Sequence, residues 1–207
     1  MKRSSLFSLA STLVLTTIYL LAGPVTISAA SSKQADFVRR SCKSTSYPDV
    51  CYRSLAKYAP SVKRSPRQLA WAALKVSADK ACSVSSFLAH MSARPIPNSF
   101  SKTEQSTYQD GAIRDCIDNL KDSADLLKRS LKEMTRLGRA TSARFAWHLN
   151  NVETWVSGAL TGETTCLDSL SQSPGSRVRT VAIKKKVANA AQATSNALAL
   201  VNQLGPH

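Results

Sequence analysis

The chain has 207 residues, of which 43% are hydrophobic, and it carries 28 lysine and arginine residues against 13 acidic residues. This length suffices for one ordinary domain and argues against two, so we expect a single hydrophobic core. The formal net charge of +15 predicts attraction to polyanions.

The first thirty residues have the pattern of a secretory signal peptide. Lys2 and Arg3 precede an apolar run over residues 6–22, and small residues follow at 28–30. Hydroxyl side chains interrupt the run, which is shorter than the roughly 20 apolar residues that a membrane span needs. We therefore expect residues 1–30 to be removed, without a membrane span.

The exported part is then a basic domain over residues 31–207. Without Lys2 and Arg3, 26 basic and 13 acidic residues remain. Outside the cell the available polyanions are acidic polysaccharides or lipid headgroups, so nucleic acid is not an expected partner. The alternative, that the charge only keeps the protein in solution, stays open.

Two short helices are expected at the start of this domain. Residues 35–42 form the first, and Pro48 favours the start of a second one that carries Cys51. Isolated helices this short are marginal in water. A bridge between Cys42 and Cys51 would pin them as a hairpin.

Four longer segments repeat apolar residues at alternating spacings of four and three, which predicts amphipathic helices. The first covers residues 66–91 and ends before two prolines, and the second covers 113–134 and ends at Gly138. The third begins near Ser142 and is expected to stop between Gly158 and Gly162, because glycine commonly follows a helix. The last runs from about 183 to 204, after a loop at 171–176.

The predicted fold class is therefore all-α. Four long helices with short connections most simply form an up-down-up-down four-helix bundle, extended by the N-terminal helical hairpin. The same spacing also fits a coiled-coil seam, but short connections and extra apolar residues beside each stripe favour packing within one chain.

The five cysteines fit an exported protein, and their odd number leaves one thiol unpaired. They are Cys42, Cys51, Cys82, Cys116 and Cys166. Cys42 and Cys51 are close enough in sequence to bridge a local turn, and a second bridge would use two of the other three. Single, scattered histidines give no metal-ligand pattern, so we predict neither a metal nor a cofactor.

Three motifs make the chain resemble the plant invertase and pectin methylesterase inhibitor family. They are Tyr47-Pro48 between Cys42 and Cys51, the segment ending in Cys116 over residues 113–116, and the block over residues 154–161 that leads into Thr164-Thr165-Cys166. The resemblance covers nearly all of residues 33–204. It implies a four-helix bundle with a helical hairpin and a second disulfide, Cys116–Cys166.

Cys82 is then the unpaired thiol. The family's spare cysteine commonly lies nearer the C-terminus, so this position is a departure from the pattern. We interpret Cys82 as a small apolar side chain rather than a reactive group.

The resemblance implies a secreted cell-wall inhibitor that covers an enzyme's substrate groove without a covalent step. Invertase inhibitors resemble one another in a Pro-Lys-Phe segment before the last helix, where this chain has Ser-Pro-Gly-Ser-Arg at residues 173–177. Pectin methylesterase is therefore the favoured partner and invertase the alternative. No nucleophile and base share a recognisable pattern, so the protein is not expected to be an enzyme.

The resemblance also suggests contact residues. Family members have acidic residues six and nine positions after the third bridging cysteine, which correspond to Asp122 and Asp125, and Asp118 shares their helix face. A threonine before the last cysteine corresponds to Thr165. The alternative is a solvated surface in which Asp125 pairs with Arg129 or Lys121.

A further alternative is a cationic wall protein held on demethylated pectin by electrostatic contact. Its candidate clusters are Lys128-Arg129, Arg136 with Arg139, and Lys184-Lys185-Lys186. Raised ionic strength would weaken such contact, whereas a specific complex with an enzyme would persist.

Overall fold

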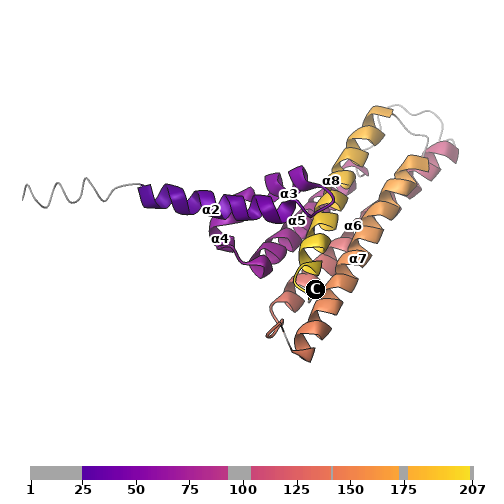
Figure 1. Ribbon diagram of the computed structural model, residues 1–207. Coiled ribbons are helices and arrows are strands. Elements are labelled where there is room, and N and C mark those ends of the chain that lie inside the picture. Colours follow the sequence, from indigo (N-terminus) through magenta and orange to yellow (C-terminus); the bar gives the residue numbers. More distant parts are fainter. Residues whose placement is uncertain (1–24, 93–103, 141, 173–176, 206–207) are drawn as a thin grey trace, which may run out of the picture.

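A computed structural model describes residues 25–92, 104–140, 142–172 and 177–205. In these ranges every regular element is a helix (Figure 1). The elements are α2 (Val25–Cys42), α3 (Pro48–Leu55), the 3-10 helix η1 (Ala56–Tyr58), α4 (Ala59–Val62), α5 (Pro66–Ser92), α6 (Glu104–Met134), α7 (Ala143–Gln172) and α8 (Arg177–Asn202). Not one of these helices combines the length and the apolar character that crossing a membrane requires.

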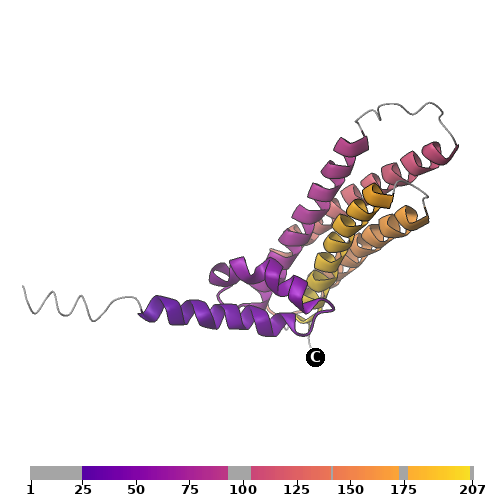
Figure 2. The same cartoon turned by 90° about the horizontal axis from the view of Figure 1, so that it is seen from above.

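The four long helices form the predicted bundle. Helix α5 packs against α6 and α8, and α7 packs against the same two helices, so each helix lies beside its neighbours in an antiparallel square. Helices α2, α3 and α4 gather at one end of this bundle, and α2 extends away from it (Figures 1 and 2). The all-α, up-down-up-down fold with an N-terminal hairpin is therefore confirmed.

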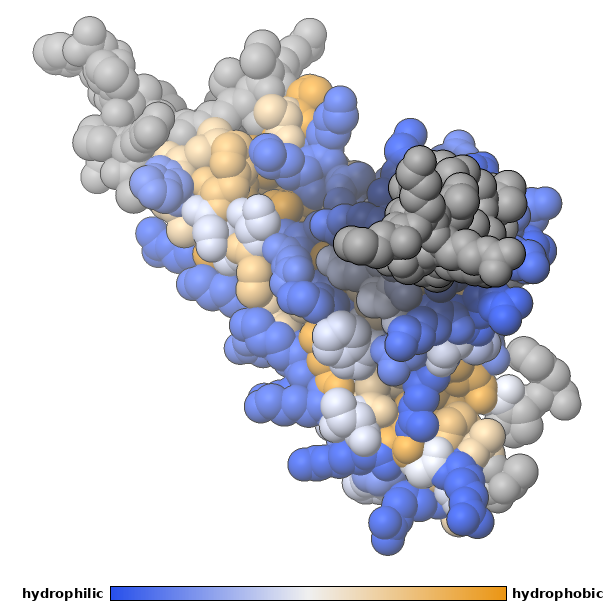
Figure 3. Space-filling view, turned by 90° about the vertical axis from the view of Figure 1, so that its left-hand side faces the viewer, coloured by the Kyte–Doolittle hydropathy of each residue, from blue (hydrophilic) through white to orange (hydrophobic). Residues whose placement is uncertain are grey.

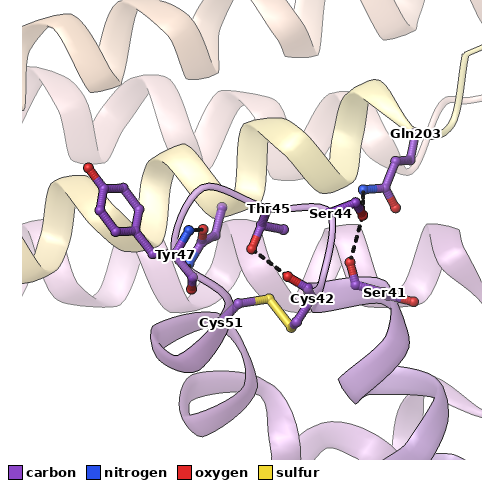
Figure 4. Close-up of a disulfide and its surroundings, with 8 residues drawn as sticks. Ser41, Cys42, Ser44, Thr45, Tyr47, Cys51 and Gln203 are labelled. Atoms are coloured by element: carbon purple, nitrogen blue, oxygen red, sulfur yellow. Dashed lines mark hydrogen bonds between the residues drawn. A yellow bond between two sulfur atoms is a disulfide. The ribbon is translucent and has the colours of Figure 1, made fainter.

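The hairpin is fastened internally and to the bundle (Figure 4). The predicted Cys42–Cys51 disulfide joins the end of α2 to α3, and Pro48 occupies the first turn of α3. The backbone amide of Tyr47 donates to Asn196 of α8, and the Asn196 amide donates to the Tyr47 carbonyl, both at 3.0 Å. Because this pairing is reciprocal, it sets the position of the hairpin on α8.

Several helix ends differ from the predicted ones. Helix α2 begins at Val25 rather than near residue 35. Helix α6 ends at Met134, before Gly138, because the amides of Thr135 and Arg136 bond to carbonyls three residues back and tighten the last turn. The prolines at 95 and 97 and the loop at 173–176 lie outside the described residues.

The prediction that the third long helix stops between Gly158 and Gly162 is wrong, because α7 continues to Gln172. A methyl group on Gly162 would lie 2.7 Å from the Ser123 hydroxyl oxygen and 3.2 Å from the Asn119 carbonyl oxygen, both on α6. Glycine is therefore used here for close contact between two helices and does not end α7.

The second disulfide joins α6 to α7 through Cys116 and Cys166, as the family resemblance implied. It closes a loop of 50 residues. In the chain-entropy treatment such a bridge stabilises the fold by about 4 kcal/mol. Cys82 is unpaired and half-buried on α5, where it packs beside the apolar core.

Apolar side chains fill the interior along the whole bundle. One cluster lies at the hairpin end and includes Leu55, Leu74 and Leu127. A second surrounds the Cys116–Cys166 disulfide. On the side shown in Figure 3, hydrophilic side chains cover most of the described surface, and apolar ones are exposed between them in several patches.

Candidate protein-binding face

Three predicted contact residues lie on one exposed side of α6. Asp118, Asp122 and Asp125 follow at spacings of four and three, and all three are exposed. The apolar stripe of the same helix, which includes Ile117, Leu120 and Leu127, is buried. The carboxylates therefore point away from the core and share one face.

Thr165 lies on the neighbouring helix α7 and is also exposed. The disulfide holds the Cα atoms of Cys116 and Cys166 4.4 Å apart. Because the helices are antiparallel, Thr165 lies within about one helical turn of Asp118 along the bundle axis. We call Asp118, Asp122, Asp125 and Thr165 the acidic face.

Two of the three carboxylates have a lysine partner on the same helix. Lys121 Nζ lies 3.2 Å from Asp118, and Lys128 Nζ lies 3.0 Å from Asp125. The hydrogen bond to Asp125 is the main reason why the pKa of Lys128 is raised. Asp125 thus pairs with Lys128, and neither Arg129 nor Lys121 takes the place that the alternative interpretation gave them.

Asp122 differs from its neighbours because no ion pair links it to a described residue. Exposed ion pairs contribute at most about 1 kcal/mol, so the lysines beside Asp118 and Asp125 can be displaced by a partner at small cost. Asp122 requires no such exchange. Its carboxylate is the most available anion on the acidic face.

Tight packing under this face holds α6 and α7 together. The Ser123 hydroxyl donates to the Ala159 carbonyl across the helix interface at 2.9 Å. Gly162 lies against the same hydroxyl. Together with the Cys116–Cys166 bridge, these contacts make the backbone that carries the acidic face one rigid unit.

A buried carboxyl group, Glu163, lies on the inner side of α7. Its side chain is 0% exposed, and one oxygen, Oε1, accepts a hydrogen bond from the Thr194 hydroxyl of α8 at 3.0 Å. The other oxygen, Oε2, has no hydrogen-bond partner among the described atoms. Burial raises the pKa of Glu163 to about 8, against a smaller opposing effect of the Thr194 hydrogen bond.

A second buried carboxyl group, Glu133 near the end of α6, is fully partnered. Its Oε1 lies 2.7 Å from His148 Nδ1 and accepts a 2.9 Å hydrogen bond from the Asn151 amide, and Oε2 lies 3.3 Å from Arg136. Burial alone raises the pKa of Glu133, but these hydrogen bonds and nearby cations outweigh it, so the pKa is lowered. The cluster links α6 to the start of α7.

Neither buried carboxyl group was predicted from the sequence. Glu163 continues the spacing of Val156 and Ala159 toward Cys166, so the stripe already indicates that it points inward. The signal was lost because the helix was expected to end at Gly162. Glu133 carries no comparable signal, since its partner His148 belongs to a different helix.

Within the described residues no group of three or more histidine, cysteine or acidic side chains is arranged to hold a metal ion.

Residues 36–200 match the family described as plant invertase/pectin methylesterase inhibitor. The chain belongs to this family. Pectinesterase inhibitor 9 of Arabidopsis thaliana is 43% identical to it over 175 residues, which cover 83% of this chain and 82% of the relative. The 21 kDa protein of Daucus carota is 38% identical over 179 residues, which cover 86% and 89% of the two chains.

The family fold also agrees with a solved structure. A crystal structure of a mutant pectin methylesterase inhibitor from Arabidopsis covers 80% of this chain with a TM-score of 0.57, and 95% of that structure is matched. Its sequence identity is 19%, so the likeness concerns the fold alone. Pectinesterase 3 of Phaseolus vulgaris is 31% identical over 166 residues, which are 26% of that longer protein. The resemblance inferred from the motifs is confirmed.

Proposed function

We propose that this protein inhibits a plant pectin methylesterase by covering its substrate groove in a non-covalent one-to-one complex. The observation that carries the proposal is family membership together with relatives that are named pectinesterase inhibitors. The role is that of an inhibitor rather than an enzyme. By this action the protein regulates de-esterification of pectin in the cell wall.

The acidic face supports the choice of contact surface. Asp122 offers an unpaired carboxylate, and Asp118 and Asp125 offer carboxylates whose lysine partners are exposed and weakly held. A rigid pair of helices loses little conformational freedom on binding, which favours a stable complex. Thr165 adds a hydroxyl group beside the carboxylates.

Invertase is the alternative target, because the family name includes both kinds of inhibitor. The segment that would decide, residues 173–176, lies outside the described residues. Its sequence lacks the Lys-Phe pair of the invertase branch. We therefore retain pectin methylesterase as the first choice.

The proposed location is the cell wall, reached by secretion. The N-terminal pattern over residues 1–30 supports this location. Both disulfides agree with an oxidising compartment.

The test is titration of the oxidised protein into a plant pectin methylesterase assay and, in parallel, into a cell-wall invertase assay at pH about 5 to 6. We expect loss of esterase activity at one equivalent and no loss of invertase activity. Asp122→Asn should weaken inhibition by about tenfold, because a charge-assisted contact is removed.

Asp79→Asn is the matched control for the charge change. Asp79 is an exposed carboxylate on α5, away from the acidic face, and it pairs with Lys75. We expect this variant to inhibit like the unchanged protein. Equal weakening by both variants would contradict the assigned face, and inhibition of invertase alone would move the target to the other branch.

A further inference from the structure

The charges of the bundle are unevenly divided between its two pairs of neighbouring helices. Helices α6 and α7 together contain ten of the thirteen acidic residues. Helix α8 contains no acidic residue and five basic ones, and α5 contains a single acidic residue, Asp79. The α5–α8 side is therefore basic, and the acidic face lies on the other helix pair.

A hollow of about 710 Å³ lies on this basic side, between α5 and α8. We call it the basic groove. Its lining has no acidic side chain among the described residues. The lining residues are Lys80, Ser83, Val84, Ala182, Lys185, Lys186, Ala188, Asn189 and Gln192.

The three lysines of the groove have no carboxylate partner in the described part of the chain. Lys80 donates to the neutral Asn189 side chain, and Lys186 lies 4.7 Å from the centre of the Phe87 ring. Burial, and then the positive charge of Lys57, lower the pKa of Lys80. Both effects disfavour the charged form of Lys80, and an anion bound beside it would oppose them.

The groove is elongated along the helices. On α8 the lining residues Lys185, Asn189 and Gln192 follow at spacings of four and three, so they share one face over about 10 Å. A second hollow of about 460 Å³ also includes Ser83 and is lined further along α5 by Ser86, Phe87, His90 and Met91. The depression therefore suits an extended chain better than a compact ion.

The chemistry of the lining indicates what kind of chain. Lysines bind carboxylates, the amides of Asn189 and Gln192 and the Ser83 hydroxyl bind hydroxyl groups, and Val84 with Phe87 offers apolar contact to ring carbons. Proteins that bind a membrane surface present a protruding amphipathic face to the lipid. These lysines line a hollow instead, so the groove is less suited to a membrane than to a chain.

We propose that the basic groove binds a segment of a carboxylated polysaccharide, the de-esterified form of the polymer on which pectin methylesterases act. The choice of polymer rests on the proposed function, because hydrolysis of methyl esters leaves free carboxylates. Binding in the groove leaves the acidic face free to bind the esterase. The inhibitor would therefore be retained in regions of the cell wall where pectin has already been de-esterified.

The test measures binding of fluorescently labelled polygalacturonate oligomers by anisotropy, without any esterase, at 50 to 300 mM salt. Fully methyl-esterified oligomers of equal length and anionic phospholipid vesicles serve as comparison probes. We expect binding to the acid oligomer that weakens with salt, and at least tenfold weaker binding to the ester and to the vesicles.

The double variant Lys185→Gln/Lys186→Gln should weaken oligomer binding by about tenfold or more, because two charge-assisted contacts are lost. The matched control is Lys132→Gln/Arg144→Gln, which removes the same charge from exposed positions on α6 and α7. The control should change binding less than threefold. Equal weakening by both double variants would assign binding to net charge and overturn the groove.

A second pair of variants adds charge and removes no lysine. Ala182→Glu places a carboxylate in the groove and should reduce binding, whereas Ala146→Glu at an exposed position of α7 should not. Tighter binding to vesicles than to the oligomer, or no binding to the oligomer at 50 mM salt, would also overturn the proposal.

Esterase titration separates this proposal from the proposed function. Lys185→Gln/Lys186→Gln should inhibit a soluble esterase on a short substrate like the unchanged protein. If the protein binds the oligomers but inhibits no esterase, the proposal for the groove stands and the proposed inhibitor role is refuted. The reverse result would refute the groove alone.

Discussion

The α6–α7 side and the α5–α8 side of the bundle show how one fold supports two kinds of surface. Between α6 and α7, small side chains and a disulfide bring the helices close, and the outer face is acidic. Between α5 and α8, the long side chains of Lys80 and Lys186 border a hollow, and acidic residues are nearly absent.

The difference between the two sides shows that net charge alone does not describe the surface of this protein. A formal value of +15 suggests a uniformly basic protein. The structure instead separates the charges. Asp118, Asp122 and Asp125 follow the helical period on the outer face of α6, whereas every charged residue of α8 is basic. Binding of a charged partner depends on the electrostatic potential at the surface it contacts, and not on the net charge of the whole protein.

The largest expected effect concerns the Cys116–Cys166 disulfide between α6 and α7. Replacing Cys116 and Cys166 together by alanine should lower the free energy of unfolding by about 4 kcal/mol, against about 2.5 kcal/mol for Cys42 and Cys51, because the first bridge closes the longer loop. Urea denaturation of both double variants measures the difference. A larger loss from the hairpin bridge would show that loop length does not govern these stabilities.

The buried Glu163 should make stability depend on pH. Its pKa is about 8 in the folded protein, and the group has an ordinary carboxyl pKa when unfolded. Between these values the unfolded state has lost a proton that the folded state keeps. Stability should therefore fall as pH rises from about 4.5 to 8, by on the order of 4 kcal/mol.

The variant Glu163→Gln removes the titrating proton and should flatten this dependence. The Glu133→Gln variant provides the contrast, because the pKa of Glu133 is lowered in the folded state. The stabilising contribution of Glu133 is lost as pH falls, with the opposite sign. The contribution of Glu133 is lost only below its unfolded pKa of 4.5, so urea midpoints are measured from pH about 3 to 8.5. Equal pH dependence in Glu163→Gln and the unchanged protein would contradict the assignment.

The close packing of α6 and α7 predicts a smaller effect at Gly162. Alanine there would meet the Ser123 hydroxyl and the Asn119 carbonyl, so Gly162→Ala should destabilise the protein by about 1 to 2 kcal/mol despite the better helix propensity of alanine. Gly111, which lies inside α6, has open space around it. Gly111→Ala should stabilise by about 0.5 to 1 kcal/mol.

Thermal unfolding of the two glycine variants gives the comparison directly. Shifts of opposite sign are expected. A stabilised Gly162→Ala variant would mean that α6 and α7 tolerate a wider separation than the structure indicates.

The smallest expected effect concerns the ion pairs of the acidic face. Lys128→Gln frees the Asp125 carboxylate and should change the free energy of unfolding by less than about 0.5 kcal/mol, since the pair is exposed. If Asp125 meets the esterase, the same variant should inhibit slightly better. Chemical denaturation and inhibitor titration on one preparation measure both quantities, and a large loss of stability would contradict the interpretation of a loosely held pair.

Much of the fold was predictable because helical periodicity is local. The stripe from Ala70 to Leu88 and the stripe of α8 from Ile183 to Val201 are buried as expected. The hairpin was predictable for the same reason, since Pro48 and the nearby Cys42 and Cys51 act over a few residues. The signal peptide over residues 1–30 stays a prediction.

The candidate site was predictable only in part. Periodicity placed Asp118, Asp122 and Asp125 on one face of α6, but their actual lysine partners depend on side-chain orientation, which spacing alone leaves open. The assignment of Thr165 came from family resemblance. The contact roles of all four residues stay proposals.

The sequence by itself determined the helical class, the apolar stripes, the family motifs and the excess of positive charge, because each is carried by residue types and short spacings. Only the tertiary structure decided that α7 passes through Gly162, that Glu163 is buried with an unpartnered oxygen, and that lysines of α5 and α8 border one groove. These features depend on which helices become neighbours and how closely they approach. Residues distant in sequence acquire such relations only when the bundle is packed.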